Sequence, residues 1–143
     1  MAKRSVDIII VNWNAGDLLS KCIQSIQLSL RQEIIDKVVI VDNASTDNSI
    51  SLLPSYEKTA LVLNTSNNGF AAACNQALQL CDSTYQLLIN PDVEVFPTTI
   101  GELFDYMNNN PNLGICGCSQ LDEHFQLRPS CSRFPTWLTI FYD

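Results

Sequence analysis

The feature that most constrains this fold is a continuous apolar run at residues 6–11, rich in β-branched side chains and interrupted only by Asp7. Runs of this kind are typical of strands buried on both faces, as in parallel sheets. Further apolar runs occupy residues 37–41, 61–63 and 85–89. Because helical segments separate these runs, the sequence predicts an α/β fold. Its sheet should be mainly parallel, with right-handed crossovers and helices on both faces.

Apolar side chains at helical spacing mark three helices between the strands. The first helical face carries Leu19, Cys22, Ile23, Ile26 and Leu30, the second Phe70, Cys74, Ala77, Leu78 and Cys81, and the third Ile100, Leu103, Phe104 and Met107. We also expect a short helix within residues 45–53, a strand at 113–118 and a weaker strand at 121–127. The 143 residues fit a single domain, 1–143.

Composition excludes several classes of protein. Hydrophobic residues make up 46% of the chain, charged residues 16%, and the net charge is −7. Nucleic-acid binding is disfavoured because no cluster of Lys and Arg is present. No run reaches the roughly 18–20 apolar residues of a membrane span, and nothing resembles a signal peptide. An acidic protein that holds an anionic ligand needs a metal ion or backbone N–H groups.

The six cysteines do not form a metal framework. Cys116 and Cys118 are spaced too closely for a zinc knuckle, and the only histidine is His124. Most of the cysteines fall on apolar faces, which favours small buried side chains in a reducing cytoplasm.

The segment Asn90-Pro91-Asp92-Val93 directly follows the apolar run 85–89. In open α/β sheets, ligands collect beyond the carboxyl ends of the strands. An acid beside a rigid proline at that point is suited to hold a divalent cation against a phosphate. The same residues are also good turn formers, so a plain strand-to-loop turn is the alternative.

Two more polar segments follow predicted strands. Asp42 comes directly after residues 38–41 and can accept a hydrogen bond from a base N–H or a ribose hydroxyl. Its alternative role is an Asx turn, and Asp47 fits a helix start. Asn68 lies just ahead of the second helix, with Asn75 inside it among small residues. Backbone N–H groups at that helix start could face a phosphate, and the alternative is an Asn-capped helix.

Common nucleotide motifs are absent. The loop after the first strand has one glycine, Gly16, where a dinucleotide-binding turn needs three, and no Gly-x-x-x-x-Gly-Lys occurs. A nucleotidyltransferase would want a basic Gly-rich loop there. These spacings disfavour nicotinamide and ATP cofactors.

Four motifs in series resemble the family-2 glycosyltransferases of the GT-A fold, and specifically their rhamnosyltransferase-like branch. They are Val11-Asn12-Trp13-Asn14, residues 39–49 (VIVDNASTDNS), Asn68-Gly69-Phe70-Ala71-Ala72 and residues 87–92 (LLINPD). Their order and spacing match across roughly residues 5–135. The resemblance implies the Rossmann-like nucleotide-diphospho-sugar transferase fold, here as a truncated, N-terminal donor-binding part.

The resemblance also implies roles for individual residues. The donor nucleotide is assigned to Val11, Asn12, Asn14, Asp42, Asn68, Asn75 and Asn90, with Asn12 acting largely through its backbone. Asp92 is the metal-binding acid, for Mg²⁺ or Mn²⁺, and Asn90 replaces the first acid of the family's Asp-x-Asp motif.

The implied reaction is inverting transfer of a sugar from a nucleoside-diphosphate donor, dTDP-rhamnose or a UDP-sugar, to a saccharide or lipid-linked acceptor. This reaction belongs to cell-envelope polysaccharide synthesis, in the cytoplasm or peripherally at the inner face of the membrane. The family's general base is expected beyond Asp143, because Glu94, Asp122 and Glu123 do not match its motif. We therefore expect weak or no turnover from this chain alone.

A non-catalytic module of the same fold, binding nucleotide-sugar or self-associating, is the alternative. The aromatic-rich residues 134–142 would then support a homodimer.

Overall fold

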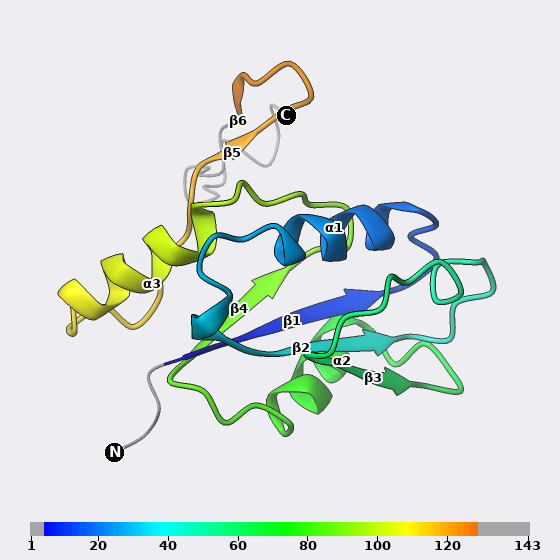
Figure 1. Ribbon diagram of the computed structural model, residues 1–143. Helices are drawn as coiled ribbons and strands as arrows, with labels where there is room; N and C mark the ends of the chain where they lie inside the picture. The colour runs from blue at the N-terminus through cyan, green and yellow to red at the C-terminus, as the bar shows by residue number, and fades with distance from the viewer. Residues whose placement is uncertain (1–4, 129–143) are drawn as a thin grey trace, which may run out of the picture. The chain divides into compact units, whose positions relative to one another are not determined.

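The computed structural model describes residues 5–128, and contacts divide the chain into two compact units, 1–110 and 111–143. The first unit contains a parallel sheet of four strands in the order β3-β2-β1-β4. These strands are β1 (Val6–Asn12), β2 (Ile35–Asp42), β3 (Thr59–Leu63) and β4 (Tyr85–Ile89). All four arrows point the same way in Figure 1. The four predicted strands are thus confirmed, with small differences at their ends.

Strand order locates the edge where polar residues gather. From β1 the chain moves to β2 and β3 on one side, and then crosses to β4 on the other side of β1. The carboxyl ends of β1 and β4 are therefore the switch point of the sheet, the place where open α/β sheets bind ligands. The register pairs Asn12 with Asp42 and Ile10 with Ile89, so all three strands end close to the same level.

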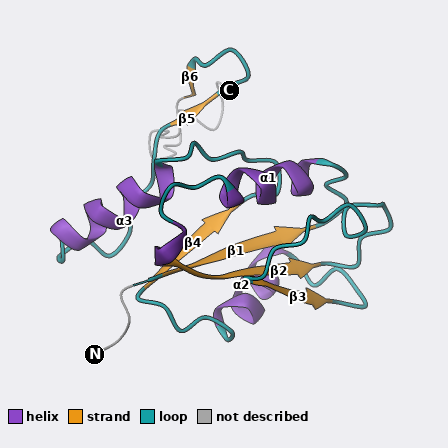
Figure 2. Cartoon of the chain, in the orientation of Figure 1, coloured by secondary structure: helices purple, strands orange, loops and turns teal. Residues whose placement is uncertain are grey.

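Helices cover both faces of the sheet, as predicted (Figure 2). Alternate residues of β1 divide between two cores, because successive side chains of a strand point to opposite faces. Ile8 and Ile10 pack with α1 (Leu18–Gln27) and α3 (Thr99–Asn109), whereas Ile9 packs with α2 (Phe70–Leu78). Each of these buried isoleucines stabilises the fold by about 1.5–3 kcal/mol.

The first helix ends earlier than its apolar spacing predicted. α1 stops at Gln27, and Leu30 is 72% exposed rather than on the buried face. The amide of Gln32, at the start of the 3₁₀ turn η1 (Gln32–Ile34), donates to the carbonyls of Ile26, Gln27 and Ser29. These bonds satisfy the free carbonyls at the helix end, which explains the early stop.

The short helix expected within residues 45–53 is wrong, because this segment forms turns. Ser49 donates its backbone N–H and its hydroxyl to Oδ1 of Asp47, at 3.0 and 2.6 Å. Side chains that bond local backbone groups compete with helix formation. One helical hydrogen bond remains, from Leu52 N to Asn48 O at 3.1 Å.

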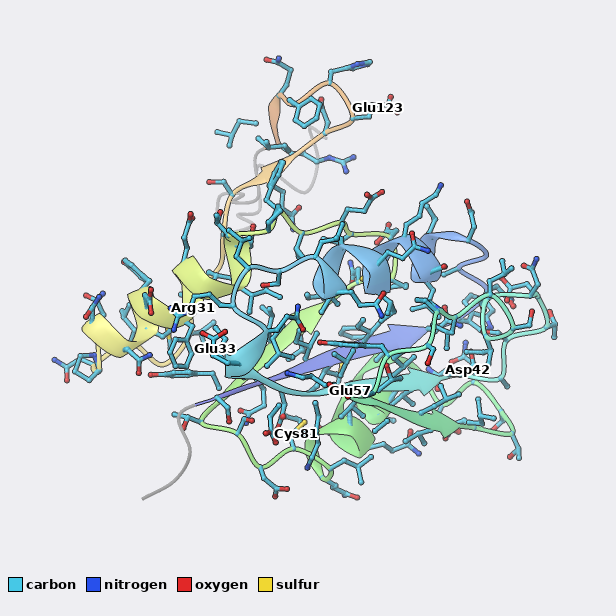
Figure 3. The ribbon with its side chains drawn as sticks, in the orientation of Figure 1. Arg31, Glu33, Asp42, Glu57, Cys81 and Glu123 are labelled. Atoms are coloured by element: carbon cyan, nitrogen blue, oxygen red, sulfur yellow. The ribbon has the colours of Figure 1, made fainter. Side chains whose placement is uncertain are left out.

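The acid inside the first strand is buried at the end of the sheet opposite Asp42. Oδ2 of Asp7 accepts hydrogen bonds from the backbone N–H groups of Asp82 and Ser83, at 2.8 and 2.9 Å. Burial and the negative charge of Asp7 raise the pKa of Cys81 to about 11, so this thiol stays neutral. Figure 3 shows Asp42 and Cys81 at these two ends.

The second unit differs from prediction. Residues 113–118, expected as a strand, have no regular structure, and Ile115 is 90% exposed. Gly114 and Gly117 interrupt the apolar run, and glycine weakens a strand. The weaker strand expected at 121–127 is instead an antiparallel hairpin of β5 (Gln120–Leu121) and β6 (Leu127–Arg128). The aromatic residues proposed for a homodimer lie outside the described residues.

The cysteines are only partly buried. Cys22 and Cys74 are buried and Cys118 is exposed, while Cys131 lies outside the described residues. The prediction of small buried side chains therefore holds for the helical positions and is wrong for Cys118.

Candidate functional site

The site lies at the carboxyl edge of the sheet, where Asn12 is the hub of a buried polar network. Its side-chain amide lies 2.7 Å from Oδ1 of Asp42, 2.8 Å from Oγ of Ser49 and 3.0 Å from Oγ of Ser45. Asn12 is 0% exposed and Asp42 4%. With Asp47, these residues form what we call the strand-end network.

The hydrogens of the network can be assigned from its partners. Ser45 donates its hydroxyl to Asp42 and Ser49 donates its hydroxyl to Asp47, each at 2.6 Å. Both serine oxygens therefore face the NH₂ group of Asn12, which fixes the orientation of the amide, and its two hydrogens are shared among Ser45, Ser49 and Asp42. A carboxylate accepts only, so Asp42 also requires the NH₂ group. The position therefore requires a side-chain donor, while Oδ1 of Asn12 is buried without a hydrogen-bond partner among the described residues.

The network also holds two loops together. Asn14 donates its backbone N–H to Oγ of Ser45 at 2.9 Å, and its Oδ1 accepts from the N–H of Thr46 at 2.8 Å. Gly16 donates its backbone N–H to Oδ2 of Asp47 at 2.8 Å. The hydrogen bonds from Ser49 keep the pKa of Asp47 below its usual value. The loop after β1 is thus fixed to the loop after β2.

Ala44 adopts a left-handed backbone conformation, with φ of 60°. This conformation costs a side chain about 1–2 kcal/mol, and glycine avoids the cost. After the unfolded-state entropy of glycine is subtracted, Ala44→Gly should stabilise the protein by about 0.5–1 kcal/mol. Urea denaturation checks this, with Ala72→Gly in exposed helix as control, which should lose about 1 kcal/mol. Equal losses from both variants would contradict the strain at Ala44.

A second group of polar side chains joins the strand ends to α2. Asn64, just after β3, donates its amide to Oδ1 of Asn43 and to Oε1 of Gln76, both at 2.9 Å. Gln76 returns a hydrogen bond to Asn64 at 3.1 Å, and Asn43 donates to the carbonyl of Gly69 at 3.3 Å. We call Asn43, Asn64 and Gln76 the amide cluster.

The predicted residues near α2 are both exposed. Asn68 lies in the loop before the helix, where its Oδ1 accepts from the hydroxyl of Ser66 at 3.1 Å. Asn75 lies on the exposed side of α2, whose buried side is formed by Ala73, Cys74 and Ala77. Val11 is buried against α2, so its side chain belongs to the core. The structure does not bring these three side chains together.

The segment after β4 forms a hydrogen-bonded turn, in which Val93 donates its N–H to the carbonyl of Asn90 at 3.2 Å. The turn leaves the side chains of Asn90 and Asp92 exposed beside the switch point between β1 and β4. Both predictions for this segment, a strand-end acid and a plain turn, describe it correctly. The turn is what presents the acid.

A buried thiol lies beneath this turn. Cys22 is buried on α1 and lies 3.8 Å from the carbonyl of Asn90. Burial, followed by the negative charges of Asp92 and Glu94, raises the pKa of Cys22 to about 12. The exposed carboxylate of Asp92 is an oxygen donor of the kind that Mg²⁺ and Mn²⁺ prefer.

No group of three metal-binding side chains occurs among residues 5–128. One carboxylate is sufficient where a phosphate ligand supplies the other oxygens, because Mg²⁺ commonly binds through one or two protein carboxylates, substrate phosphates and water. Asp92 therefore fits a cation that arrives with a diphosphate.

Sequence reasoning missed two contributions to the site. Trp13 is 59% exposed on the loop after β1, next to Asn12, and an exposed indole there is a surface for stacking. Ser45 and Ser49 complete the strand-end network, and their spacing of three and seven residues after Asp42 was the available signal.

A four-stranded parallel sheet, with polar side chains and the exposed acid Asp92 at its switch point, defines an α/β protein suited to binding a phosphorylated ligand. Residues 7–131 match the family described as Glycosyl transferase family 2. The chain therefore belongs to glycosyltransferase family 2, which confirms the resemblance drawn from its motifs.

One similar protein is the N-acetylglucosaminyl-diphospho-decaprenol L-rhamnosyltransferase of Mycobacterium tuberculosis. It is 24% identical over 141 residues, which is 90% of this chain and 45% of that protein. The chain spans between 15% and 45% of the lengths of the curated relatives it matches.

Solved structures show the same fold. TarS of S. aureus in complex with UDP-GlcNAc aligns with a TM-score of 0.65 and 16% identity, covering 75% of this chain and 32% of that one. The mannosyltransferase PcManGT from Pyrobaculum calidifontis, in complex with GDP-Man and Mn²⁺, aligns with a TM-score of 0.64 and 23% identity, covering 71% and 32%. The GT-A fold is confirmed. Within residues 5–128, no helix has the length and apolarity to cross a membrane.

Proposed function

We propose that this chain forms the donor-binding part of an inverting glycosyltransferase that transfers a sugar from a nucleoside diphosphate to an acceptor hydroxyl. The observation that carries the proposal is the exposed carboxylate of Asp92, on a hydrogen-bonded turn beside the switch point of the sheet. Family membership supports the reaction class. The nucleotide-sugars bound by TarS and PcManGT support the donor class.

Different residues are proposed for the nucleobase, the ribose and the diphosphate of the donor. The strand-end network holds the loop that carries Trp13, whose exposed ring offers a stacking surface for the nucleobase. Asn90 has a free amide suited to a ribose hydroxyl. Asp92 would hold Mg²⁺ or Mn²⁺, which supplies positive charge for the departing diphosphate when it is bound. Asp42 acts through the network, because its carboxylate already accepts three hydrogen bonds.

We assign the general base to sequence beyond Asp143, so this chain alone binds the donor with little turnover. The donors proposed are dTDP-rhamnose or a UDP-sugar, and the acceptor is a saccharide or a lipid-linked sugar in cell-envelope synthesis. The Mycobacterium tuberculosis relative, named for rhamnosyl transfer to a lipid-linked sugar, supports this choice. The cytoplasm, or the inner face of the membrane, is the compartment where such donors are available.

The direct test is a thermal shift series with dTDP, UDP and GDP, each with and without Mn²⁺. A ligand at 100-fold its Kd should stabilise the protein by about 2.7 kcal/mol, which is a rise of several degrees in Tm. Mn²⁺ with inorganic pyrophosphate is the control that lacks the nucleoside, and it shows how much of the shift in Tm the nucleoside contributes. Equal Tm values with and without every nucleotide would overturn the proposal.

The non-catalytic module remains the second candidate, and turnover separates the two. The full-length protein, supplied with donor, Mn²⁺ and a lipid-linked acceptor, should release nucleoside diphosphate and form a glycoside of inverted configuration. Donor binding without release of nucleoside diphosphate would favour the module.

Trp13→Ala should weaken nucleotide binding about tenfold, because stacking of a base on an aromatic ring contributes about 1–3 kcal/mol. Isothermal titration with the preferred nucleotide measures the loss, and Trp13→Phe should recover part of it. Tyr106→Ala, at a residue of α3 that is 55% exposed, is the control and should bind normally. Unchanged affinity in Trp13→Ala would remove the indole from the base site.

A further inference from the structure

We propose that the amide cluster of Asn43, Asn64 and Gln76 consists of positioning residues that set the loop 65–69 for the donor nucleotide. The inference deepens the proposed function and rests on it, since the loop carries Asn68. Three elements meet in the cluster: the end of β2, the end of β3 and the outward side of α2.

The loop has little else to hold it. Residues 65–70 are all exposed, so no apolar side chain fixes them to the core. Within the loop, Gly69 donates its N–H to Oδ1 of Asn67 at 2.9 Å and Ser66 bonds Asn68, but these contacts are local. The carbonyl of Gly69 accepts from Asn43 at 3.3 Å and from the N–H of Ala73 at 3.2 Å. Asn43 therefore ties the loop to the strand ends.

The orientation of Asn43 is set by its partners. Its N–H donates to the carbonyl of Asn12 at 2.8 Å, and it is 2% exposed. Its Oδ1 accepts from Asn64, which leaves its NH₂ group for Gly69. If the side-chain amide of Asn64 rotated by half a turn, Oδ1 of Asn43 would lose its hydrogen bond. That bond keeps the NH₂ group of Asn43 directed toward the carbonyl of Gly69.

Gln76 in turn sets the orientation of Asn64. The two amides exchange hydrogen bonds in both directions, at 2.9 and 3.1 Å. Both hydrogens on Nδ2 of Asn64 are used, one for Asn43 and one for Gln76. The direction of every bond in the cluster therefore depends on Gln76 being both a donor and an acceptor.

Gln76→Glu tests this dependence with little change in shape or helix propensity. An ionised carboxylate cannot donate to Oδ1 of Asn64, so two oxygens face each other where Gln76 now donates, and this repulsion favours rotation of the Asn64 amide away from Asn43. Protonation restores one donor. We expect the Kd of the nucleotide to rise about tenfold at neutral pH, equivalent to one hydrogen bond of about 1.4 kcal/mol. The ratio of variant to wild-type Kd should fall toward one as the pH drops below about 4.3, the ordinary pKa of a glutamic acid, because the new carboxyl then gains a proton.

Gln76→Leu keeps the side-chain size and removes both functions, so its affinity should be low at every pH. Gln79→Leu, at the C-cap of α2, is the matched control and should bind as the wild type does. Hydrogen exchange at Gly69 and Phe70 should be faster in both Gln76 variants. Their urea midpoints should fall modestly, because a part-buried amide loses its partner, but both variants should remain folded when nucleotide is titrated.

The outcomes separate the two proposals. A wild-type protein that binds no nucleotide overturns the proposed function. A wild-type protein that binds, with both Gln76 variants binding equally well, overturns the positioning role alone. An affinity loss in Gln76→Glu that is the same at every pH also overturns it, because donor reversal would then not be the cause.

Discussion

Asn12→Asp should destabilise the protein by about 3–5 kcal/mol near neutral pH, the cost of an uncompensated buried charge. The substitution places an oxygen 2.7 Å from Oδ1 of Asp42, in a site where Asn12 is 0% exposed. Ser45 and Ser49 already direct their hydroxyl hydrogens to Asp42 and Asp47. The new carboxylate therefore finds acceptors where it needs donors.

The loss should depend on pH with a defined sign. Two carboxyls at this distance share one proton, so the folded variant has a carboxyl pKa raised above the unfolded value of about 3.9. The folded state then binds more protons than the unfolded state, and stability falls as pH rises through this range. Urea denaturation at several pH values should show the variant nearest to wild type in acid.

Asn14→Asp is the matched control for this prediction. Oδ1 of Asn14 accepts from the N–H of Thr46, a role that an aspartate keeps, and the side chain is exposed. Its effect should stay within about 0.5 kcal/mol. If Asn12→Asp were as stable as Asn14→Asp at neutral pH, Asn12 would not be the hub of the network.

Features of the fold that depend on neighbouring residues in the chain could be predicted from the sequence. The strands at 6–11 and 85–89 were predictable because short apolar runs bounded by polar loop residues favour strands, and β1 is buried along its whole length. The turn at Asn90–Val93 was predictable from proline and its polar neighbours. These features depend on residues that lie next to each other in the chain.

Features that depend on residues far apart in the sequence were not predicted. Residues 45–53 have helix-start residues, yet Ser49 and Asp47 are used by Asn12 and Gly16, which lie more than 30 positions earlier. Local helix signals then lose to tertiary hydrogen bonds. Asp42 makes the local bond expected of an Asx turn, from the N–H of Ser45, together with bonds from Asn12 and the Ser45 hydroxyl, and its predicted contact with a base stays a prediction.

The predicted site residues fall into two groups for the same reason. Asn12 and Asp42 face each other because β1 and β2 are paired in register. The second group is exposed and consists of Asn68, Asn75, Asn90 and Asp92. The roles proposed for these side chains depend on a bound ligand. Nucleotide binding is therefore the measurement that decides their roles, and Asp92 is the most decisive residue among them.

Asp92→Asn should remove the contribution of Mn²⁺ to nucleotide affinity while leaving the fold intact. The side chain is exposed, so its urea midpoint should change by less than about 0.5 kcal/mol. An amide is a poorer ligand for a hard cation than a carboxylate. Because even residues that only support metal ligands contribute about 10–100-fold to metal affinity, losing the ligand should cost at least about 100-fold.

Glu94→Gln is the matched control, since it removes the same charge two residues away on the same segment. Titration of the preferred nucleotide with and without Mn²⁺ gives four values for the two variants. The expected pattern is a metal-dependent gain in Glu94→Gln and none in Asp92→Asn, with equal affinity in both when Mn²⁺ is absent. The reverse pattern would move the metal to Glu94. A full metal-dependent gain in both would show that neither acid holds the cation, and the proposed role of the turn after β4 would be lost.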